Sequence, residues 1–322
     1  MKKLLIATIS FLLIILLTGC NVDRTKEDTE GKLIVHTSVY PLEDFTKKIG
    51  GEFVRVKSIY PPGIDEHSYE PSQKDIIDMA NGDLFFYIGH NLEGFMHNAE
   101  PILKDEGVNV IAIGEKVQID ETEKPQHDHE QNEHDEHEEH EDHGHQHGSI
   151  DPHLWLDPIY AKQMAIAIKD ALSKAMPEQK AYFEENLTNL VNRLDDLHKK
   201  FETLAETAKV KQFVVSHSAY GYWEKRYGLK QLNISGISTS QEPSQKQLVE
   251  IINEIDENHL QYLLVEQNVS NKLVNVIQNE TTIDTLPIHN LAVLTKQDIE
   301  NGEDYFSLMK NNLETLKKAL NP

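Results

Sequence analysis

The chain has 322 residues, of which 31 are Lys or Arg and 54 are Asp or Glu, so its formal net charge is −23. Such a surplus of negative charge argues against nucleic acid or an anionic lipid surface as a partner, and it favours cations. A single cysteine excludes an internal disulfide. The fold is therefore held by its packed core and by any bound metal.

The N-terminal segment predicts export and lipid anchoring. Two lysines precede an apolar run from Leu4 to Leu17, which ends in Thr18-Gly19-Cys20. The run is shorter than the roughly 20 apolar residues that a transmembrane helix needs, and small residues before a cysteine are typical of a lipoprotein signal. We expect removal of residues 1–19, lipidation of Cys20 on the outer face of the cell membrane, and a flexible tether over residues 20–31. The alternative is a secretory signal with an incidental cysteine.

The rest of the chain predicts two α/β lobes. Short runs rich in β-branched residues alternate with stretches of helical periodicity, which is typical of βα units and parallel sheets. The predicted strands cover residues 33–35, 54–59, 84–88 and 108–113 in the first half, and 213–216, 231–235, 262–265 and 283–286 in the second. Two such lobes facing one another create a cleft in which ligands bind at the carboxyl ends of strands.

Two consecutive long helices are predicted between the halves, over residues 158–175 and 177–208. The apolar residues of the second helix recur at a spacing that places them on one face, which predicts one buried stripe. They are Phe183, Leu187, Leu190, Leu194, Leu197 and Phe201.

The segment from residue 120 to 148 differs from the rest of the chain. It contains eight histidines, twelve acidic residues, one lysine and no large apolar residue, so it cannot pack a core. Such composition is typical of a disordered loop that collects transition metals weakly at several sites. An acidic loop that serves only as a solvated surface would not explain why eight of the seventeen histidines lie here. These auxiliary metal-binding candidates are His127, His129, His134, His137, His140, His143, His145 and His147.

A short internal repeat supports two related lobes. The sequence Glu-Pro-Ser-Gln-Lys occurs at residues 70–74 and again at 242–246, each time after a predicted strand and loop and at the start of a predicted helix. The serines, Ser72 and Ser244, are placed to cap these helices, with Asp75 and Gln247 as their capping-box partners. A second echo relates Ser-Val-Tyr at 38–40 to Ser-Ala-Tyr at 218–220.

Three histidines stand in predicted loops rather than in packed stripes: His67, His153 and His217. Neutral imidazoles that converge from separate loops suit Zn²⁺, which binds nitrogen at about 2.0–2.1 Å in a tetrahedral array. Each histidine alone is a weak signal, because a single loop histidine is more often a surface residue.

The surrounding motifs strengthen the prediction of a metal site. They are His-x-Tyr-Glu-Pro-Ser at 67–72, Asp-Pro-His-Leu-Trp-Leu-Asp-Pro at 151–158, His-Ser-Ala-Tyr-Gly-Tyr at 217–222 and Gln-Glu-Pro-Ser at 241–244. With the lipoprotein signal and the His-rich loop, their order resembles the zinc-binding solute-binding proteins of ABC importers, the ZnuA and AdcA family of the manganese/zinc cluster. The resemblance spans nearly the whole mature chain.

This resemblance implies two α/β lobes, each a mostly parallel sheet flanked by helices, joined by one long helix. Residues 32–176 would form the N-terminal lobe, 177–208 the linking helix and 209–322 the C-terminal lobe. The metal would be clamped between the lobes by the residues that match His67, His153 and His217.

The fourth metal ligand departs from the pattern of several relatives. Those relatives supply a carboxylate from a late loop ahead of a Leu-Thr or Leu-Ser pair, whereas the matching residue here is Ala292. Others place a glutamate immediately before the first histidine, which corresponds to Glu66. The candidates are therefore Glu66, His289 or a water molecule. We expect Glu266 to be a supporting or surface carboxylate, and Trp155 to pack in the core.

The predicted function is high-affinity capture of Zn²⁺ and its delivery to an ABC permease, by a lipid-anchored monomer with no enzymatic activity. Three imidazoles with at most one carboxylate favour zinc over the alternative of Mn²⁺ or another divalent ion. A zinc hydrolase is a second alternative, but the sequence contains neither His-Glu-x-x-His, nor Gly-x-Ser-x-Gly, nor a P-loop. A surface adhesin is the third alternative.

Overall fold

The structure is a computed structural model that describes residues 30–119, 150–267 and 271–322. Residues Leu33–Pro322 form one compact unit. The predicted signal sequence, Cys20 and the His-rich loop lie outside the described residues. Within the described part of the chain, none of the helices is both long and apolar enough to cross a membrane.

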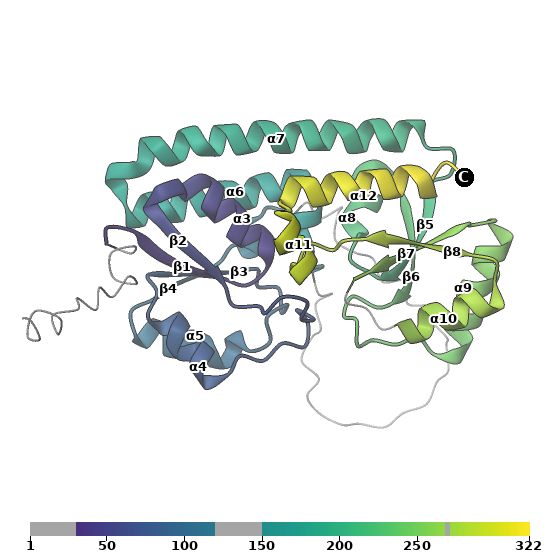
Figure 1. Cartoon of the computed structure of the whole chain (residues 1–322), viewed down its shortest axis with the longest axis horizontal. Coiled ribbons are helices and arrows are strands. Elements are labelled where there is room, and N and C mark those ends of the chain that lie inside the picture. The colour runs from purple at the N-terminus through teal and green to yellow at the C-terminus, as the bar shows by residue number, and fades with distance from the viewer. Residues whose placement is uncertain (1–29, 120–149, 268–270) are drawn as a thin grey trace, which may run out of the picture. The chain divides into compact units, whose positions relative to one another are not determined.

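The first sheet has four parallel strands in the order β2-β1-β3-β4 (Figure 1). The strands are β1 (Leu33–Thr37), β2 (Val54–Ser58), β3 (Leu84–Tyr87) and β4 (Asn109–Ala112). The helices of this half are α3 (Tyr40–Gly50), α4 (Gln73–Ala80) and α5 (Met96–Asp105), with short 3₁₀ turns at Gly51–Phe53 and Gly114–Lys116.

The second sheet repeats this arrangement, with parallel strands in the order β6-β5-β7-β8. The strands are β5 (Gln212–His217), β6 (Lys230–Ser235), β7 (Tyr262–Glu266) and β8 (Asp284–Ile288). The helices are α8 (Gly221–Tyr227), α9 (Gln245–Glu257), α10 (Asn271–Glu280), α11 (Lys296–Asn301) and α12 (Tyr305–Ala319). All eight predicted strands and the two parallel sheets are thereby confirmed.

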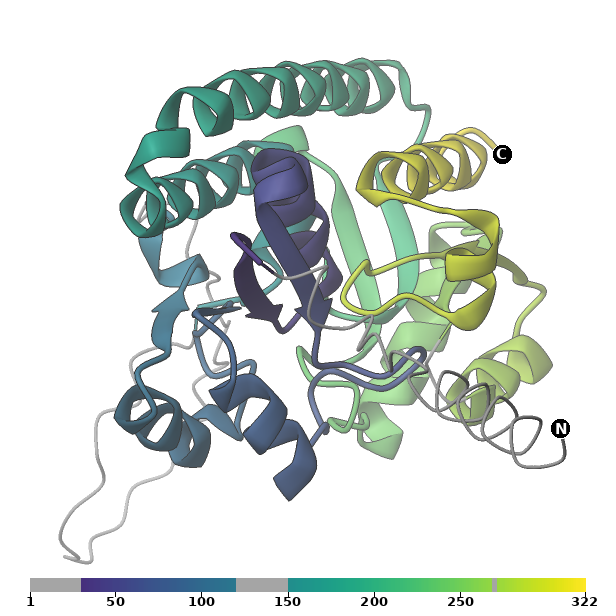
Figure 2. The ribbon, with the colours of Figure 1, turned by 60° about the vertical axis from the view of Figure 1, so that its left-hand side comes forward.

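Between the sheets the chain forms a 3₁₀ turn (Leu154–Leu156), α6 (Pro158–Ala175), a second turn (Pro177–Gln179) and α7 (Lys180–Thr207). The predicted apolar stripe is confirmed, because all six of its residues are buried along α7. Helix α7 packs against α3, α6 and α12 and so contacts elements from both halves (Figures 1 and 2). The two-lobed fold with a long helix is confirmed, while the limits of the lobes stay a prediction, because Leu33–Pro322 group as one unit.

The two halves share a continuous apolar core, and a smaller apolar cluster lies around α9 and α10. Buried hydrogen bonds also join the halves. The Trp223 indole donates to the Leu156 carbonyl at 2.8 Å, the Trp155 indole donates to the Asn290 carbonyl at 2.6 Å, and the Tyr40 amide donates to the Ala292 carbonyl at 2.8 Å. These contacts tie the turn before α6 and the start of α3 to α8 and to the loop after β8.

Both copies of the internal repeat form the predicted capping boxes. The Ser72 hydroxyl accepts a hydrogen bond from the Asp75 amide, and the Ser244 hydroxyl accepts one from the Gln247 amide, each at 3.3 Å. In return, each partner's side chain accepts a bond from the serine amide at 2.9 Å. The repeat therefore starts a helix in the same way in each half.

Candidate metal centre

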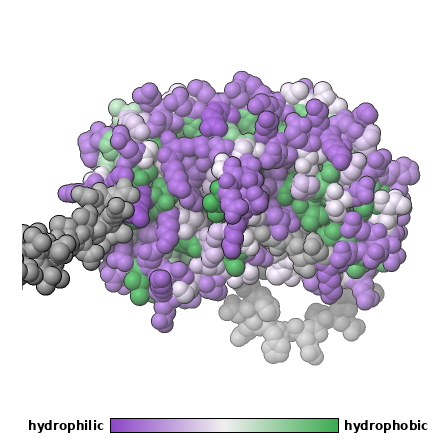
Figure 3. All heavy atoms as spheres, in the orientation of Figure 1, coloured by the Kyte–Doolittle hydropathy of each residue, from purple (hydrophilic) through white to green (hydrophobic). Residues whose placement is uncertain are grey.

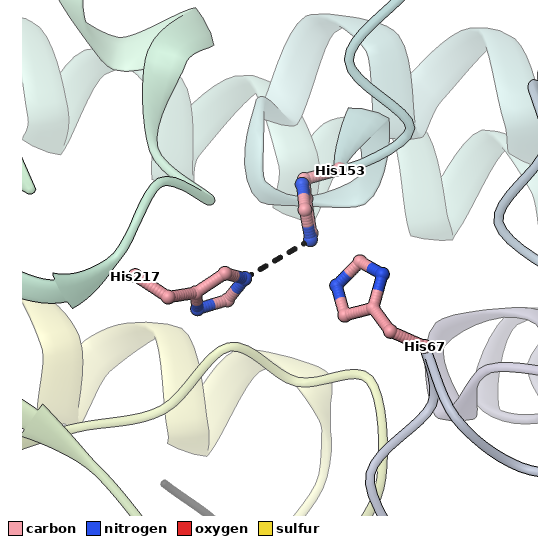
Figure 4. A group of neighbouring side chains, drawn as sticks. All are labelled: His67, His153 and His217. Atoms are coloured by element: carbon pink, nitrogen blue, oxygen red, sulfur yellow. Dashed lines mark hydrogen bonds between the residues drawn. The ribbon is translucent and has the colours of Figure 1, made fainter. Parts of the chain in front are cut away.

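The structure brings His67, His153 and His217 together from three separate segments. His67 lies between β2 and α4, His153 directly precedes the turn before α6, and His217 ends β5. One nitrogen of each ring lies within 4.8 Å of the other two, and Figure 4 shows the rings facing a common point. His153 and His217 are fully buried.

Buried carboxylates hold two of the three rings. Asp151 Oδ1 lies 2.7 Å from His153 Nδ1 and also accepts the His153 amide at 3.0 Å. Glu266 Oε1 lies 2.7 Å from His217 Nδ1 and accepts the Tyr220 hydroxyl at 3.3 Å. Because an ionised carboxylate can only accept, each Nδ1 carries the proton and each Nε2 presents a lone pair to the site.

The site requires a cation. The Nε2 atoms of His153 and His217 face one another at 3.3 Å (Figure 4), and two lone pairs at that distance repel unless a proton or a metal ion lies between them. His67 Nε2 is buried and has no hydrogen-bond partner among the described residues. An unpartnered buried nitrogen is costly, and a metal ion would satisfy it.

Burial and neighbouring charges shift the pKa values of two of the rings in opposite directions. Burial, together with the positive charges of His153 and His217, lowers the pKa of His67 to about 2, so this ring is neutral at physiological pH. Burial acts to lower the pKa of His217 as well, but the charge and hydrogen bond of Glu266 outweigh it and raise the pKa above its usual value. A proton therefore competes with a metal more strongly at His217 than at His67.

Of the two candidates for a fourth protein ligand, Glu66 lies beside the cluster and His289 is held elsewhere. Glu66 is 3 % exposed, and its Oε1 lies 3.9 Å from His67 Nε2 and accepts the Asn290 side-chain amide at 2.9 Å. Burial raises the pKa of Glu66 to about 7. His289 Nε2 instead lies 3.2 Å from Asp298 Oδ2 and 2.9 Å from the Gln267 amide nitrogen.

Two polar residues of the site were not assigned a role from the sequence: Asp151 and Asn290. Asp151 lies two residues before His153 in the Asp-Pro-His motif, so the sequence could have indicated that it contacts this histidine. Asn290 has no sequence signal of this kind, because its partner Glu66 is 224 residues away. Trp155 is fully buried, as predicted. Glu266 contacts His217 and is not one of the three side chains that converge on the site.

Two parallel α/β lobes with a buried imidazole cluster between them define a solute-binding protein with a site suited to a metal cation. Residues 35–319 match the model of the family described as zinc-uptake complex component A, periplasmic. The chain belongs to this family.

Individual relatives agree with the family match. The chain is 34 % identical to the high-affinity zinc uptake system protein ZnuA of Bacillus subtilis over 309 residues, which cover 95 % of this chain and 94 % of that protein. It is 33 % identical to the zinc-binding lipoprotein AdcA of Streptococcus pneumoniae over 99 % of this chain, but it spans only 61 % of the length of that protein. The crystal structure of the Zn(II)-bound ZnuA-like domain of that AdcA superposes with a TM-score of 0.73 at 31 % identity, covering 91 % of this chain and all of that domain.

Proposed function

We propose that this chain captures Zn²⁺ on the extracytoplasmic side of the membrane and delivers it to an ABC import permease. Membership of the zinc-uptake family supports the proposal, as do the zinc-binding and zinc-uptake names of relatives that match over nearly the whole chain. Zinc is the transported cargo, held between the lobes for the time that delivery takes.

The observation that carries the proposal is the separation of two imidazole nitrogens. Two nitrogens that each lie about 2.05 Å from a tetrahedral zinc ion are about 3.3 Å apart. The Nε2 atoms of His153 and His217 are 3.3 Å apart, and both present lone pairs because Asp151 and Glu266 accept from the opposite sides of the rings. We assign His67, His153 and His217 as the zinc ligands.

Glu66 is our candidate for the fourth ligand, with a water molecule as the alternative. Its carboxylate is buried beside His67, and a buried carboxylate without a cation tends to hold its proton, as the raised pKa of Glu66 indicates. A zinc ion within reach would displace that proton. His289 is not proposed as a ligand, because its ring is bonded to Asp298 and Gln267.

The same donor set favours zinc over manganese. Manganese prefers oxygen donors, whereas imidazole suits zinc, and the site offers three imidazoles and one nearby carboxylate. We further propose that the protein acts as a monomer anchored through lipid on Cys20, that it is not an enzyme, and that the loop at residues 120–148 gathers dilute zinc for the central site.

Metal analysis and competitive Zn²⁺/Mn²⁺ titration of the protein from Asn21 onward test this proposal. The loop at residues 120–148 is deleted in every sample, so that only the central site is measured. We expect one tight zinc site, which disappears in the variant His67→Ala/His153→Ala/His217→Ala. The matched control is His97→Ala/His198→Ala, which removes two histidines remote from the cluster and should bind zinc normally.

Each contrary result has a defined meaning. Tight zinc binding by the triple variant would show that the ligand assignment is wrong. A parent protein that prefers Mn²⁺ would change the cargo, and a parent that binds neither ion tightly would refute metal capture itself.

A further inference from the structure

The three histidines of the metal centre are not equally covered. The side chains of His153 and His217 are fully buried, whereas 9 % of the His67 side chain is exposed. Zinc that leaves by the least covered side therefore passes His67. The outer surface is no barrier to a hydrated ion, because the face drawn in Figure 3 is mostly hydrophilic with small, separate apolar areas. The loop that carries His67 thus controls how fast zinc escapes.

Asp65 shapes this loop and also reaches across to the second half of the chain. Its Oδ1 accepts the His67 amide at 2.9 Å, and its carbonyl accepts the Ser68 amide at 3.4 Å. Such a bond from an aspartate to the amide two residues later forms a local turn. The other carboxylate oxygen, Oδ2, accepts the hydroxyl of Thr239, which is 174 residues later.

Thr239 lies in a short closed loop, residues 236–241. The Gly236 amide donates to the Gln241 carbonyl at 3.1 Å, and this bond closes the loop. A Cβ atom on residue 236 would lie 2.9 Å from Gln241 Cβ, which is too short for two carbon atoms, so this closure requires glycine. The loop is therefore a defined turn that holds Thr239 in one place.

This closed loop is attached to the strand end that carries His217. It follows β6 directly, and the last residue of β6, Ser235, pairs with His217. The Gly236 carbonyl also accepts the Ser218 amide at 3.1 Å. The hydroxyl of Thr239 thus connects the segment of one metal ligand with the segment of another.

The loop of His67 is held to the second half at other points as well. Glu66 Oε1 accepts the Asn290 side-chain amide at 2.9 Å, and the Gly63 amide donates to the Leu294 carbonyl at 3.0 Å. Both bonds go to the segment between β8 and α11, and neither reaches the end of β5. The aspartate–threonine contact does, through the closed loop.

We propose that Thr239, acting through Asp65, is a positioning residue that keeps the His67 loop closed over zinc and slows release of the ion. The inference rests on the proposed function. The loop must move away from His217 before zinc can leave, and this movement breaks the bond between the hydroxyl and the carboxylate. A hydrogen bond to a charged acceptor is stronger than a neutral one, so its loss should speed zinc release about tenfold.

Stopped-flow measurement of zinc release tests the proposal. The chain from Asn21 onward is loaded with one equivalent of Zn²⁺ and mixed with a large excess of a chromogenic chelator, and the slow phase reports the central site. Thr239→Val removes the hydroxyl and keeps the side-chain shape, so the slow rate should rise about tenfold. Thr239→Ser keeps the hydroxyl and should release zinc at the parent rate. The matched control is Thr281→Val, which removes a hydroxyl that donates to the Ile277 carbonyl at 2.7 Å in the same half and should also keep the parent rate.

Two further measurements separate this role from a general loss of structure. Thr239 acts on the loop and not on the ion, so the visible absorption spectrum of the Co²⁺-loaded protein should be the same in the parent and in Thr239→Val. Asp65→Ala should itself release zinc faster than the parent. Adding Thr239→Val to Asp65→Ala should change the rate no further, because the partner of the hydroxyl is already absent.

Several results would overturn the proposal. They are release at the parent rate by Thr239→Val, equal acceleration in Thr281→Val, a changed Co²⁺ spectrum in Thr239→Val, and further acceleration in the double variant. If the parent holds one zinc ion tightly while these tests fail, the role of Thr239 alone is wrong. If the parent does not hold zinc tightly, the proposed function is wrong, and the role of Thr239 is refuted with it.

Discussion

Substitution of Glu266 by glutamine is expected to weaken zinc binding while leaving the protein folded. Glu266 is 3 % exposed, its Oε1 lies 2.7 Å from His217 Nδ1, and it also accepts the Tyr220 hydroxyl. Glutamine keeps the shape and one acceptor oxygen but removes the negative charge. The imidazole of His217 would then be a weaker base and a weaker ligand.

The expected loss is about 10- to 100-fold in zinc affinity, or about 1.4 to 2.7 kcal/mol, which is typical for carboxylates that support a metal-bound histidine. The pH dependence should change as well. Glu266 raises the pKa of His217, so protons compete with zinc in the parent protein as the pH falls through that raised pKa. In the variant the competition begins at a lower pH, and the affinity difference between the two proteins narrows as the solution becomes more acidic.

Titration against a competing chelator between pH 5.5 and 8, with thermal unfolding of the metal-free proteins, measures both effects. Glu93→Gln is a matched control, because Glu93 is also buried and accepts hydrogen bonds from Ser38 Oγ at 2.6 Å and from the Ile88 amide at 2.9 Å. That variant should lose stability but keep its zinc affinity. Parent-like zinc binding by Glu266→Gln, or an equal loss in Glu93→Gln, would refute the reasoning.

Three further changes have defined outcomes. Burial raises the pKa of Glu66 from its ordinary value to about 7, so the metal-free protein should lose stability as the pH rises from about 4.5 to 7, because the unfolded chain releases this proton first. Glu66→Gln should remove the contribution of Glu66 and make that slope shallower in urea unfolding, and an unchanged slope would contradict the assignment. Arg226→Met leaves the buried Asp157 carboxylate without its cation and should cost about 3 to 5 kcal/mol of unfolding free energy; a loss below 1 kcal/mol would show that Asp157 is satisfied by the α6 amides alone. Deletion of residues 120–148 should remove weak zinc sites seen by equilibrium dialysis, keep the tight site, and slow growth only when zinc is scarce; unaltered growth under that limitation would argue against a capture role for the loop.

The fold could be predicted because its main signals are local. The runs at residues 84–88 and 213–216 are short and apolar, which is typical of strands in a parallel sheet that is covered on both faces. The stripe along α7 follows from a spacing that any amphipathic helix shows. Helix α7 begins at Lys180 rather than Pro177, because the chain first makes a 3₁₀ turn at Pro177–Gln179.

The three histidines of the candidate site could be predicted from the sequence. The residues that contact them were harder to predict. His67, His153 and His217 stand in motifs that can be read directly, whereas the choice between Glu66 and His289 depended on tertiary contacts. The His289 amide donates to Asn312 Oδ1. Leu291, two residues later, has a φ of 62°, so the chain turns sharply there. That turn directs the His289 ring toward Asp298 and brings Asn290 to Glu66.

Neither half of the chain could form this site alone. Asn290, from the second half, accepts the Trp155 indole through its carbonyl and donates to Glu66 through its side chain, so it ties the segment of His153 to that of His67. His217 and its partner Glu266 both come from the second sheet. Because the nitrogens converge only when both halves are packed, a ligand that bridges them stabilises the whole unit. Zinc at about 1,000 times its Kd would add about 4 kcal/mol to the free energy of unfolding, because it binds the folded chain in preference to the unfolded one.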